Sequence, residues 1–524
     1  MGATPKPAQD GFGGSGGATA RLRSRVLRAL SRAQVLWLVA AAACFSLLHV
    51  FLKSAATTSA GTSTLRSPHA RDSLLAPAST SSCEVCHLDP TDPACRYGLD
   101  NIRLSRAYEG SGHRLRHVLR RALAGEEIGV GVLGASVTAG HAVPPGQQRW
   151  EDRFFEDFQR LFPSAKLHVG AAPAMDSQFF AYCTGALVPM DLDIYLVELD
   201  INNDVSFNTL RSDDALMRSL LQLPHEPAVL RVSVFSLVFD ELVRGASSAL
   251  ITSQFFDVPV ISIRGFMLPH VIRHREAASE VFGLDLGGNP DYRHIAPVAH
   301  AALGDMLSLY VQKEVCEVRR RDSLDSTQGD PEAGPWLAPE DLGVVPNLTL
   351  WGSWTRPEPP RPVTPLCQSM ASPRAPLVPL SHSKTFRVEK WNGKSAWTSS
   401  LPGSQIRLRF TGSHVGLFVY VTNGGAPDEV SEDLKVRRRQ APGTAMCWLE
   451  DPSLTGVEDG AVGAERNGDI FHVDSHFPNR PAAGFEFIEL AEDLSDGEHI
   501  LACEVSSETT SGGHKFRVQG IASF

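Results

Sequence analysis

The sequence lacks several features that would point to particular functions. It has no basic stripe outside its N-terminal part, and a net charge of −10 with a pI near 6.0 gives no support to nucleic-acid binding. No motif recurs at a fixed period, which excludes solenoids and propellers. Cys83 and Cys86 form a CxxC pair, but no second pair follows, so a disulfide is favoured over a zinc site. We therefore expect no nucleic-acid partner, no metal and no organic cofactor.

The N-terminal part indicates a membrane anchor. Residues 1–34 are rich in Gly, Ala, Pro and Arg, which is typical of a disordered tail. Residues 35–52 are almost uncharged and just long enough to span a bilayer. Arginines precede this run and only Lys53 follows it closely, which predicts a cytoplasmic tail and a lumenal remainder. A cleaved signal peptide and an organelle transit peptide are the alternatives to this single-pass type II anchor.

Residues 53–82 are rich in Ser, Thr and Ala and are expected to form a flexible stem, of a kind that can carry O-glycans. Beyond the anchor the chain has eight cysteines, an even number that indicates disulfides in an oxidising compartment. Their pairing is open. Asn347 begins an N-glycosylation sequon. These features favour the secretory pathway, either the Golgi lumen or the cell surface.

The pattern of residues 83–316 is typical of an α/β domain. Short apolar runs predict strands at 128–133, 166–170, 193–199, 228–234 and 258–263. Helical spacing of apolar residues predicts helices between them at 150–162 and 210–223, and a last one at 295–311. This alternation predicts a parallel sheet with helices on both faces, a flavodoxin-like three-layer α/β/α arrangement. The arginine-rich helical pattern at 101–125 is read as a solvated basic face.

The rest of the chain changes character. Residues 317–346 are rich in charged residues, Pro and Gly and are expected to be a linker. Residues 347–524 show alternating runs at 405–410, 415–421, 498–505 and 515–521, which predict a β-sandwich. Five tryptophans of this part could stack on sugar rings in a glycan-binding domain, although we favour a core position for most of them.

The candidate catalytic residues centre on the segment that follows the first predicted strand. The first strand ends at Gly134, where a sharp turn would lift Ser136 off the edge of the sheet at which ligands bind. His294 is the candidate base for this candidate nucleophile, and Asp291 could hold the imidazole in the right tautomer. The loops after the second and third strands supply Gly170 and Asn202, whose N–H groups could stabilise an oxyanion. A plain turn at Ser136, a helix cap at Asp291 and an Asx-turn at Asn202 are the non-catalytic alternatives.

These four blocks, in this order, resemble the SGNH (GDSL-like) hydrolase superfamily over about residues 125–315. The resemblance implies that Ser136 is the nucleophile, that Asp291 and His294 complete the triad, and that Gly170 or, in another register, Ala174 provides an oxyanion N–H. Asn202 would be the oxyanion amide, with Asn203 as the alternative. Asp200 and Asn203 stand where the family has Gly and Asp, which puts the shape of this loop in question.

The anchored architecture also resembles SGNH-type proteins that modify cell-surface polysaccharides. It implies a serine-dependent ester hydrolase or O-acyltransferase acting on an acylated glycan, with O-acetyl as the expected group. The rival is a non-catalytic glycan-binding surface protein with a decayed hydrolase domain. His141 is expected to be a surface residue or a support for the triad, and His300 to be structural.

Overall fold

The computed structural model describes residues 82–239, 242, 249–285, 287–323, 341–356, 360, 365–424, 441–450, 469–479 and 483–524. The expected tail (1–34), the expected anchor (35–52) and all of the expected stem but Ser82 lie outside these ranges. Within them no helix is both long and apolar enough to cross a bilayer. Residues 82–524 form one compact unit.

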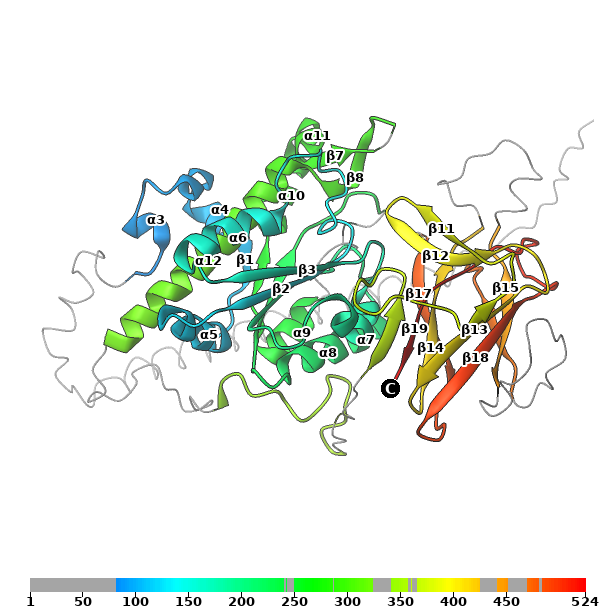
Figure 1. Cartoon of the computed structure of the whole chain (residues 1–524). Helices are drawn as coiled ribbons and strands as arrows, with labels where there is room; N and C mark the ends of the chain where they lie inside the picture. The colour runs from blue at the N-terminus through cyan, green and yellow to red at the C-terminus, as the bar shows by residue number, and fades with distance from the viewer. Residues whose placement is uncertain are drawn as a thin grey trace, which may run out of the picture. The chain divides into compact units, whose positions relative to one another are not determined.

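A six-stranded sheet forms the centre of the first half of this unit (Figure 1). Its strand order is β1-β6-β5-β4-β2-β3, and β2 to β6 are parallel. Without β1, which joins the edge antiparallel, this is the flavodoxin order 2-1-3-4-5. All five predicted strands are present. The bounds are β1 Arg106–Tyr108, β2 Gly129–Gly134, β3 Lys166–Ala171, β4 Ile194–Glu198, β5 Ala228–Ser233 and β6 Val260–Ser262.

Helices cover both faces of the sheet because successive strand residues point to opposite sides. Ile194 and Leu196 face one apolar cluster, while Tyr195 and Val197 face another. The first cluster includes residues of α4 (Leu99–Ser105), α5 (His113–Leu123), α6 (Trp150–Leu161), α10 (Arg264–Arg273) and α12 (Pro297–Ser323). The second includes residues of α7 (Ser177–Leu187), α8 (Phe207–Leu221) and α9 (Ala249–Phe256). The layers are those predicted.

Two expectations at the edges of this domain were wrong. Helix α12 runs to Ser323, so the boundary expected between residues 316 and 317 falls inside a helix. The arginine-rich segment 101–125 is not one solvated helix, because β1 separates α4 from α5. Arg106 and Arg116 are buried and paired with carboxylates, which the charge pattern alone does not reveal.

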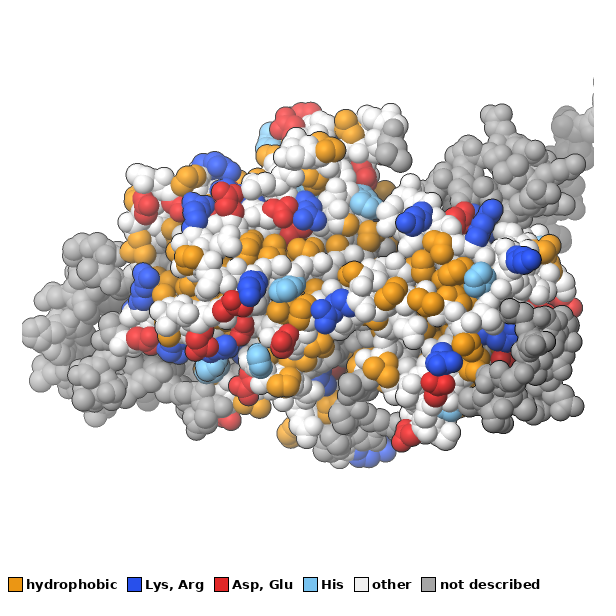
Figure 2. All heavy atoms as spheres, in the orientation of Figure 1, with side chains coloured by type: hydrophobic (Ala, Val, Ile, Leu, Met, Phe, Trp, Pro, Cys, Tyr) orange, Lys and Arg blue, Asp and Glu red, His pale blue; other side chains and the backbone are white. Residues whose placement is uncertain are grey.

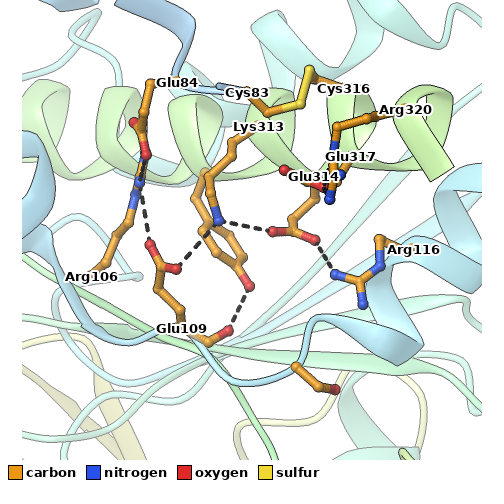
Figure 3. A network of polar contacts seen from close by, with 12 residues as sticks. Cys83, Glu84, Arg106, Glu109, Arg116, Lys313, Glu314, Cys316, Glu317 and Arg320 are labelled. Carbon is orange, nitrogen blue, oxygen red and sulfur yellow. Dashed lines mark hydrogen bonds and ion pairs between the residues drawn. A yellow bond between two sulfur atoms is a disulfide. The ribbon is translucent and has the colours of Figure 1, made fainter. Parts of the chain in front are cut away.

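These two arginines belong to a network that fastens the start of the described chain to α12 (Figure 3). Arg106 binds both carboxylate oxygens of Glu84, at 2.6 and 2.9 Å. Arg116 binds Glu314, and Lys313 lies between Glu109 and Glu314. A planar guanidinium forms the most specific carboxylate pairs, which explains why arginine occupies the two buried positions.

The strands described between residues 366 and 523 form two antiparallel sheets that enclose a third apolar cluster. One sheet has the order β10-β13-β18-β15-β16 and the other β11-β12-β19-β14-β17, with β9 paired to β19. The C-terminal part is therefore β-rich, as predicted, and all four predicted runs are strands. The bounds are β9 Leu366–Ser369, β10 Ser381–His382, β11 Arg387–Trp391, β12 Lys394–Ser399, β13 Gln405–Thr411, β14 Val415–Val421, β15 Thr444–Glu450, β16 Phe471–Asp474, β17 Gly484–Ala491, β18 Glu498–Val505 and β19 Phe516–Ser523.

The structure pairs all eight cysteines of the described region. The bonds are Cys83–Cys316, Cys86–Cys95, Cys183–Cys367 and Cys447–Cys503. The third joins α7 to β9 and thus links the α/β half to the β half covalently. Asn347 is exposed, so its sequon is accessible, and its glycosylation stays a prediction.

The five tryptophans do not share one environment. Trp448 is buried in the β half, and Trp391 and Trp397 are half-buried. Trp351 and Trp354 are exposed, at 41% and 86%, whereas Trp391 and Trp397 pack against the apolar clusters, so the expectation of a core position holds for three of the five. On the face that Figure 2 shows, charged side chains of both signs are interspersed.

Candidate active site

The candidate nucleophile lies at the switch point of the sheet. Strand β2 is the strand from which the chain order reverses, with β3 on one side and β4 on the other. In open parallel sheets ligands bind at the carboxyl ends of the strands at this point. Ser136 follows β2 and Asn202 follows β4, so both are placed at that edge. Gly134 closes the strand because a Cβ there would lie 2.0 Å from Thr138 Oγ1.

Ser136, His294 and Asp291 are in hydrogen-bond contact. His294 Nε2 lies 2.8 Å from Ser136 Oγ, and His294 Nδ1 lies 2.7 Å from Asp291 Oδ2. The first contact joins residues 158 positions apart in the chain. Ser136 and His294 are buried, with exposed fractions of 6% and 9%. In this arrangement His294 can activate Ser136 as a base, and the carboxylate of Asp291 orients the His294 ring.

A kink in one strand makes the Asp–His contact possible. Both residues lie in β8 (Pro290–Ile295), which pairs with β7 (Phe282–Leu284). In a regular strand, residues three apart point to opposite faces. Tyr292 between them has a φ of 55°, which breaks the alternation. Its carbonyl accepts hydrogen bonds from Leu237 N–H and the Ser236 hydroxyl, which hold the kink in place.

The electrostatics favour a charged Asp291. Burial acts to raise the pKa of Asp291, but the hydrogen bond and charge of His294 outweigh it and hold the pKa below its ordinary value. Its second oxygen accepts a hydrogen bond from Arg293 N–H. An ionised carboxylate at this position keeps the proton of the imidazole on Nδ1, which leaves Nε2 as the base.

The structure corrects one oxyanion residue. Gly170 lies inside β3, and a Cβ on it would meet Leu187, Val188 and a backbone carbonyl, so it is not among the residues that line the pocket. Ala174, the alternative register, does line the pocket and has a φ of 65°, the left-handed conformation that glycine adopts most easily. The sequence favours Gly170 because a glycine is the expected residue there.

Asn202 lines the pocket beside Ser136. Its backbone N–H donates to Leu199 O, and its Oδ1 is buried with no hydrogen-bond partner in the part of the chain that the structure describes. This oxygen is an acceptor that a hydroxyl of a ligand can satisfy, whereas an oxyanion needs the donors of the amide nitrogen. With the N–H groups of Ser136 and Ala174, Asn202 Nδ2 supplies the kind of donors that an oxyanion requires.

Asp200 and Asn203, the two departures from the family pattern, hold this loop from inside. The buried Asp200 carboxyl accepts a hydrogen bond from Ser233 on β5. Asn203 Oδ1 accepts from Ser177 N–H at 3.1 Å and from the Ser177 hydroxyl at 3.0 Å. Asn203 is therefore fixed to the start of α7, and Asn202 remains the candidate for the oxyanion role.

A buried carboxyl supports the nucleophile turn. Glu198, at the end of β4, accepts hydrogen bonds from the Thr138 N–H and hydroxyl, at 3.3 and 3.0 Å. Complete burial raises the pKa of Glu198 to about 8, which favours the neutral carboxyl at this position. Neither the composition nor the spacing of the sequence signals this contact, which joins the turn to a neighbouring strand.

Two further histidines lie near the triad. His141 lines the pocket, and its ring packs edge-on against His294 at 5.0 Å between centroids. Burial, followed by the effects of His294 and Lys394, lowers the pKa of His141 to about 4. His300 is fully buried and accepts a hydrogen bond from Trp150 N–H, and burial lowers its pKa to about 3. His300 thus has the structural place that the sequence indicates.

The triad opens into a pocket of about 330 Å³, a size suited to a small ligand. Polar side chains dominate its lining, and several of them lie in the N-terminal part of α8, including Asn208, Thr209 and Ser212. Lys394, Gly484 and Glu486 of the β half also line it, which sequence reasoning did not anticipate because these residues lie far along the chain.

Comparison with known proteins gives fold-level matches. No family model and no curated protein sequence matches this chain. It is similar to the crystal structure of a two-domain esterase (CEX) active on acetylated mannans, co-crystallized with mannopentaose. The TM-score is 0.51 at 16% identity, covering 80% of this chain and 97% of that one. A second structure of such an esterase gives 0.51 at 17%, covering 80% and 98%. The likeness supports the SGNH-type fold and the β-rich C-terminal part.

Proposed function

We propose that this protein is a serine-dependent carboxylic ester hydrolase that removes short acyl groups, O-acetyl above all, from a glycan. The observation that carries the proposal is the Ser136–His294–Asp291 chain of contacts at the switch point of the sheet. Its fold-level likeness to an esterase active on acetylated mannans is consistent with this activity.

In the proposed mechanism, His294 Nε2 removes the proton of Ser136 Oγ as this oxygen attacks the ester carbonyl. The N–H groups of Ser136 and Ala174 and the amide of Asn202 stabilise the oxyanion. The C–O bond to the sugar then breaks, and the sugar oxygen takes the proton from His294. Water attacks the acyl-serine, His294 accepts its proton and returns it to Ser136 Oγ, and the free acid leaves.

The pocket lining supports a small acyl group on a polar alcohol. Its apolar side chains are few, and only Ile201 and Phe239 among them are large, whereas a long fatty acyl chain requires a continuous apolar channel. Hydroxyl, amide and charged side chains make up most of the remaining lining and match the hydroxyl groups of a sugar.

We further propose that the protein works in the secretory pathway or at the cell surface, held there by residues 35–52. Four disulfides among the described residues support an oxidising compartment. The positive flank of residues 35–52 supports the orientation.

The test is reaction of the purified full-length chain with a fluorophosphonate probe, beside Ser136→Ala and His294→Ala. We expect labelling of the wild type, none of the serine variant and a strong reduction in the histidine variant. Persistent labelling of Ser136→Ala would place the reactive serine elsewhere. A folded wild type that neither reacts nor hydrolyses 4-nitrophenyl acetate would favour the non-catalytic glycan-binding protein instead.

The acyl acceptor can be assigned in the same system. Hydrolysis releases acetate in proportion to ester consumed, whereas transfer moves the acetyl group to an added oligosaccharide. We propose water as the acceptor, and acetyl-oligosaccharide in the product mixture would instead show an O-acyltransferase.

A further inference from the structure

The pocket at the triad has walls from two parts of the molecule. The α/β half supplies Ser136, His294 and the polar residues at the N-terminal end of α8. The β half supplies Lys394, the first residue of β12, and Gly484 and Glu486 at the start of β17. These last residues lie 100 to 192 positions beyond His294 in the chain, counting from 294 to 394 and to 486. The β half is therefore part of the site and not an appendage beside it.

The junction between the two halves is extensive and covalently tied. The Cys183–Cys367 disulfide joins α7 to β9. The rings of Phe179 and Phe418 meet across the junction at 5.0 Å between centroids, and those of Tyr182 and Phe487 at 4.7 Å. Because one apolar cluster includes residues of α7, β14 and β17, the β-half wall keeps a fixed position relative to the triad.

The tip of the β11–β12 hairpin reaches toward the catalytic histidine. Its turn residues Asn392 and Gly393 both have positive φ, 42° and 71°, as a tight two-residue hairpin requires. A Cβ on Gly393 would lie only 2.9 Å from His141 Nε2. His141 in turn packs against His294. One residue thus separates the hairpin from the catalytic base, and Lys394 follows directly after the turn.

The charged groups on this wall are positioned by packing. The Lys394 ammonium lies 5.8 Å from the ring centroid of Tyr420, which is 4% exposed. Glu486 sits on β17 next to the buried Phe485, whose ring packs against Tyr420 at 5.1 Å. A donor and an acceptor held in place beside a polar wall suit a ligand that carries several hydroxyl groups, because each hydroxyl both donates and accepts.

We propose that Lys394 and Glu486 form a sugar-binding subsite of the catalytic pocket together with Asn208 and Thr209, so that the β half selects the alcohol part of the ester. The acyl group lies at Ser136, and the sugar that carries it lies against the β-half wall. The reaction in this inference rests on the proposed function, whereas the binding of the sugar at the subsite does not.

The test compares two substrates in the full-length protein. 4-Nitrophenyl acetate presents an acetyl group without a sugar, and an acetylated manno-oligosaccharide presents both. In Lys394→Met and Glu486→Gln we expect kcat/KM for the oligosaccharide to fall about tenfold or more beyond any change for the aryl ester, the usual effect of losing a charge-assisted hydrogen bond. Lys390→Met, in the neighbouring strand β11 of the same hairpin, and Glu489→Gln, in β17, alter exposed residues that do not line the pocket. These controls should leave the ratio of the two kcat/KM values unchanged.

Equal losses on both substrates, or no loss on either, would overturn the subsite. If the wild type has no esterase activity, the binding of acetylated manno- and xylo-oligosaccharides to the Ser136→Ala protein is measured instead. A weaker affinity after Lys394→Met then supports the subsite while the proposed reaction fails. Unchanged affinity, or no binding of either oligosaccharide, overturns the subsite.

Discussion

At the scale of single residues, the protein depends on side chains whose ionisation is fixed by their surroundings. Asp291 is held charged by His294, whereas burial favours the neutral forms of Glu198 and His300. Ser136, Asn202, Asp291 and His294 could be identified from the sequence. The first two follow predicted strands, and the last two form an Asp-x-x-His motif just before the last predicted helix. The protonation states could not, because they depend on burial by residues distant in the chain.

Asp291→Asn should retain the fold and lose most of the activity. The amide cannot hold the proton on His294 Nδ1 in the way that the carboxylate does, so Nε2 is no longer reliably the base. We expect kcat/KM for 4-nitrophenyl acetate to fall by about 10³- to 10⁴-fold. Asp285→Asn, an exposed change in the same hairpin, is the control. A loss of less than tenfold in Asp291→Asn would argue against its orienting role.

His300 should make the protein sensitive to acid. Its pKa is about 3 in the folded protein against an ordinary value of 6.5, so below pH 6.5 the unfolded chain binds the proton more readily. The stabilisation is complete above pH 6.5 and is lost as the pH falls toward 3, at up to about 1.4 kcal/mol per pH unit.

Urea unfolding of wild type and His300→Asn from pH 7 to pH 4 measures this effect. Asparagine can accept the Trp150 N–H bond without gaining a charge, so the variant should lose less stability on acidification. The exposed His117→Asn should follow the wild type. If the free energies of unfolding of His300→Asn and wild type fall equally as the pH is lowered, His300 is not the source of the acid sensitivity.

At the scale of elements, local patterning predicted the central parallel strands well but missed several helices, among them α7, α9 and α10. The central strands are short apolar runs between turns, and this pattern can be recognised from the local sequence without knowledge of tertiary contacts. Helix α7 packs against the sheet on one side and the β half on the other, so it is apolar around most of its circumference and shows no helical period. The kink at Tyr292 was likewise invisible, because its cause is the pair of hydrogen bonds from Leu237 and Ser236.

The β8 kink gives a test at this scale. A β-branched residue strongly disfavours a φ of 55°, whereas glycine accepts it. We expect Tyr292→Ile to lower the free energy of unfolding by about 1–3 kcal/mol and to lower kcat/KM strongly, because straightening the strand separates Asp291 from His294. Tyr292→Gly should keep most of the activity. Equal activities in the two variants would show that the kink does not set the Asp–His contact.

At the scale of the whole molecule, the α/β half and the β half pack together in one compact unit, residues 82–524. A composition rich in charge and proline suggested a linker at 317–346. Instead, α12 extends into it, and Arg114 and Arg218 bind backbone carbonyls of residues 343, 346 and 348. Such contacts cannot be anticipated from composition, because their partners are backbone atoms.

The Cys183–Cys367 disulfide should therefore matter for stability more than the local Cys86–Cys95 bond. The two bonds close loops of 184 and 9 residues. The chain-entropy model gives the longer loop an advantage of about 2–3 kcal/mol. We expect thermal unfolding of the Cys183→Ser/Cys367→Ser protein at a clearly lower temperature than that of Cys86→Ser/Cys95→Ser. The reverse order would show that native-state packing around these bonds outweighs loop closure.

The Cys83–Cys316 bond has a mechanical consequence. A force that pulls on the chain at Ser82 and at Phe524 enters through Cys83 and passes across the sulfur bridge directly to Cys316 in α12. Ser136, Asp291 and His294 all lie between these two cysteines in sequence, outside the path that carries the tension. Stretching the oxidised protein should extend the β half first and leave the catalytic segment unloaded, whereas reduction of this bond would bring that segment into the path of the force.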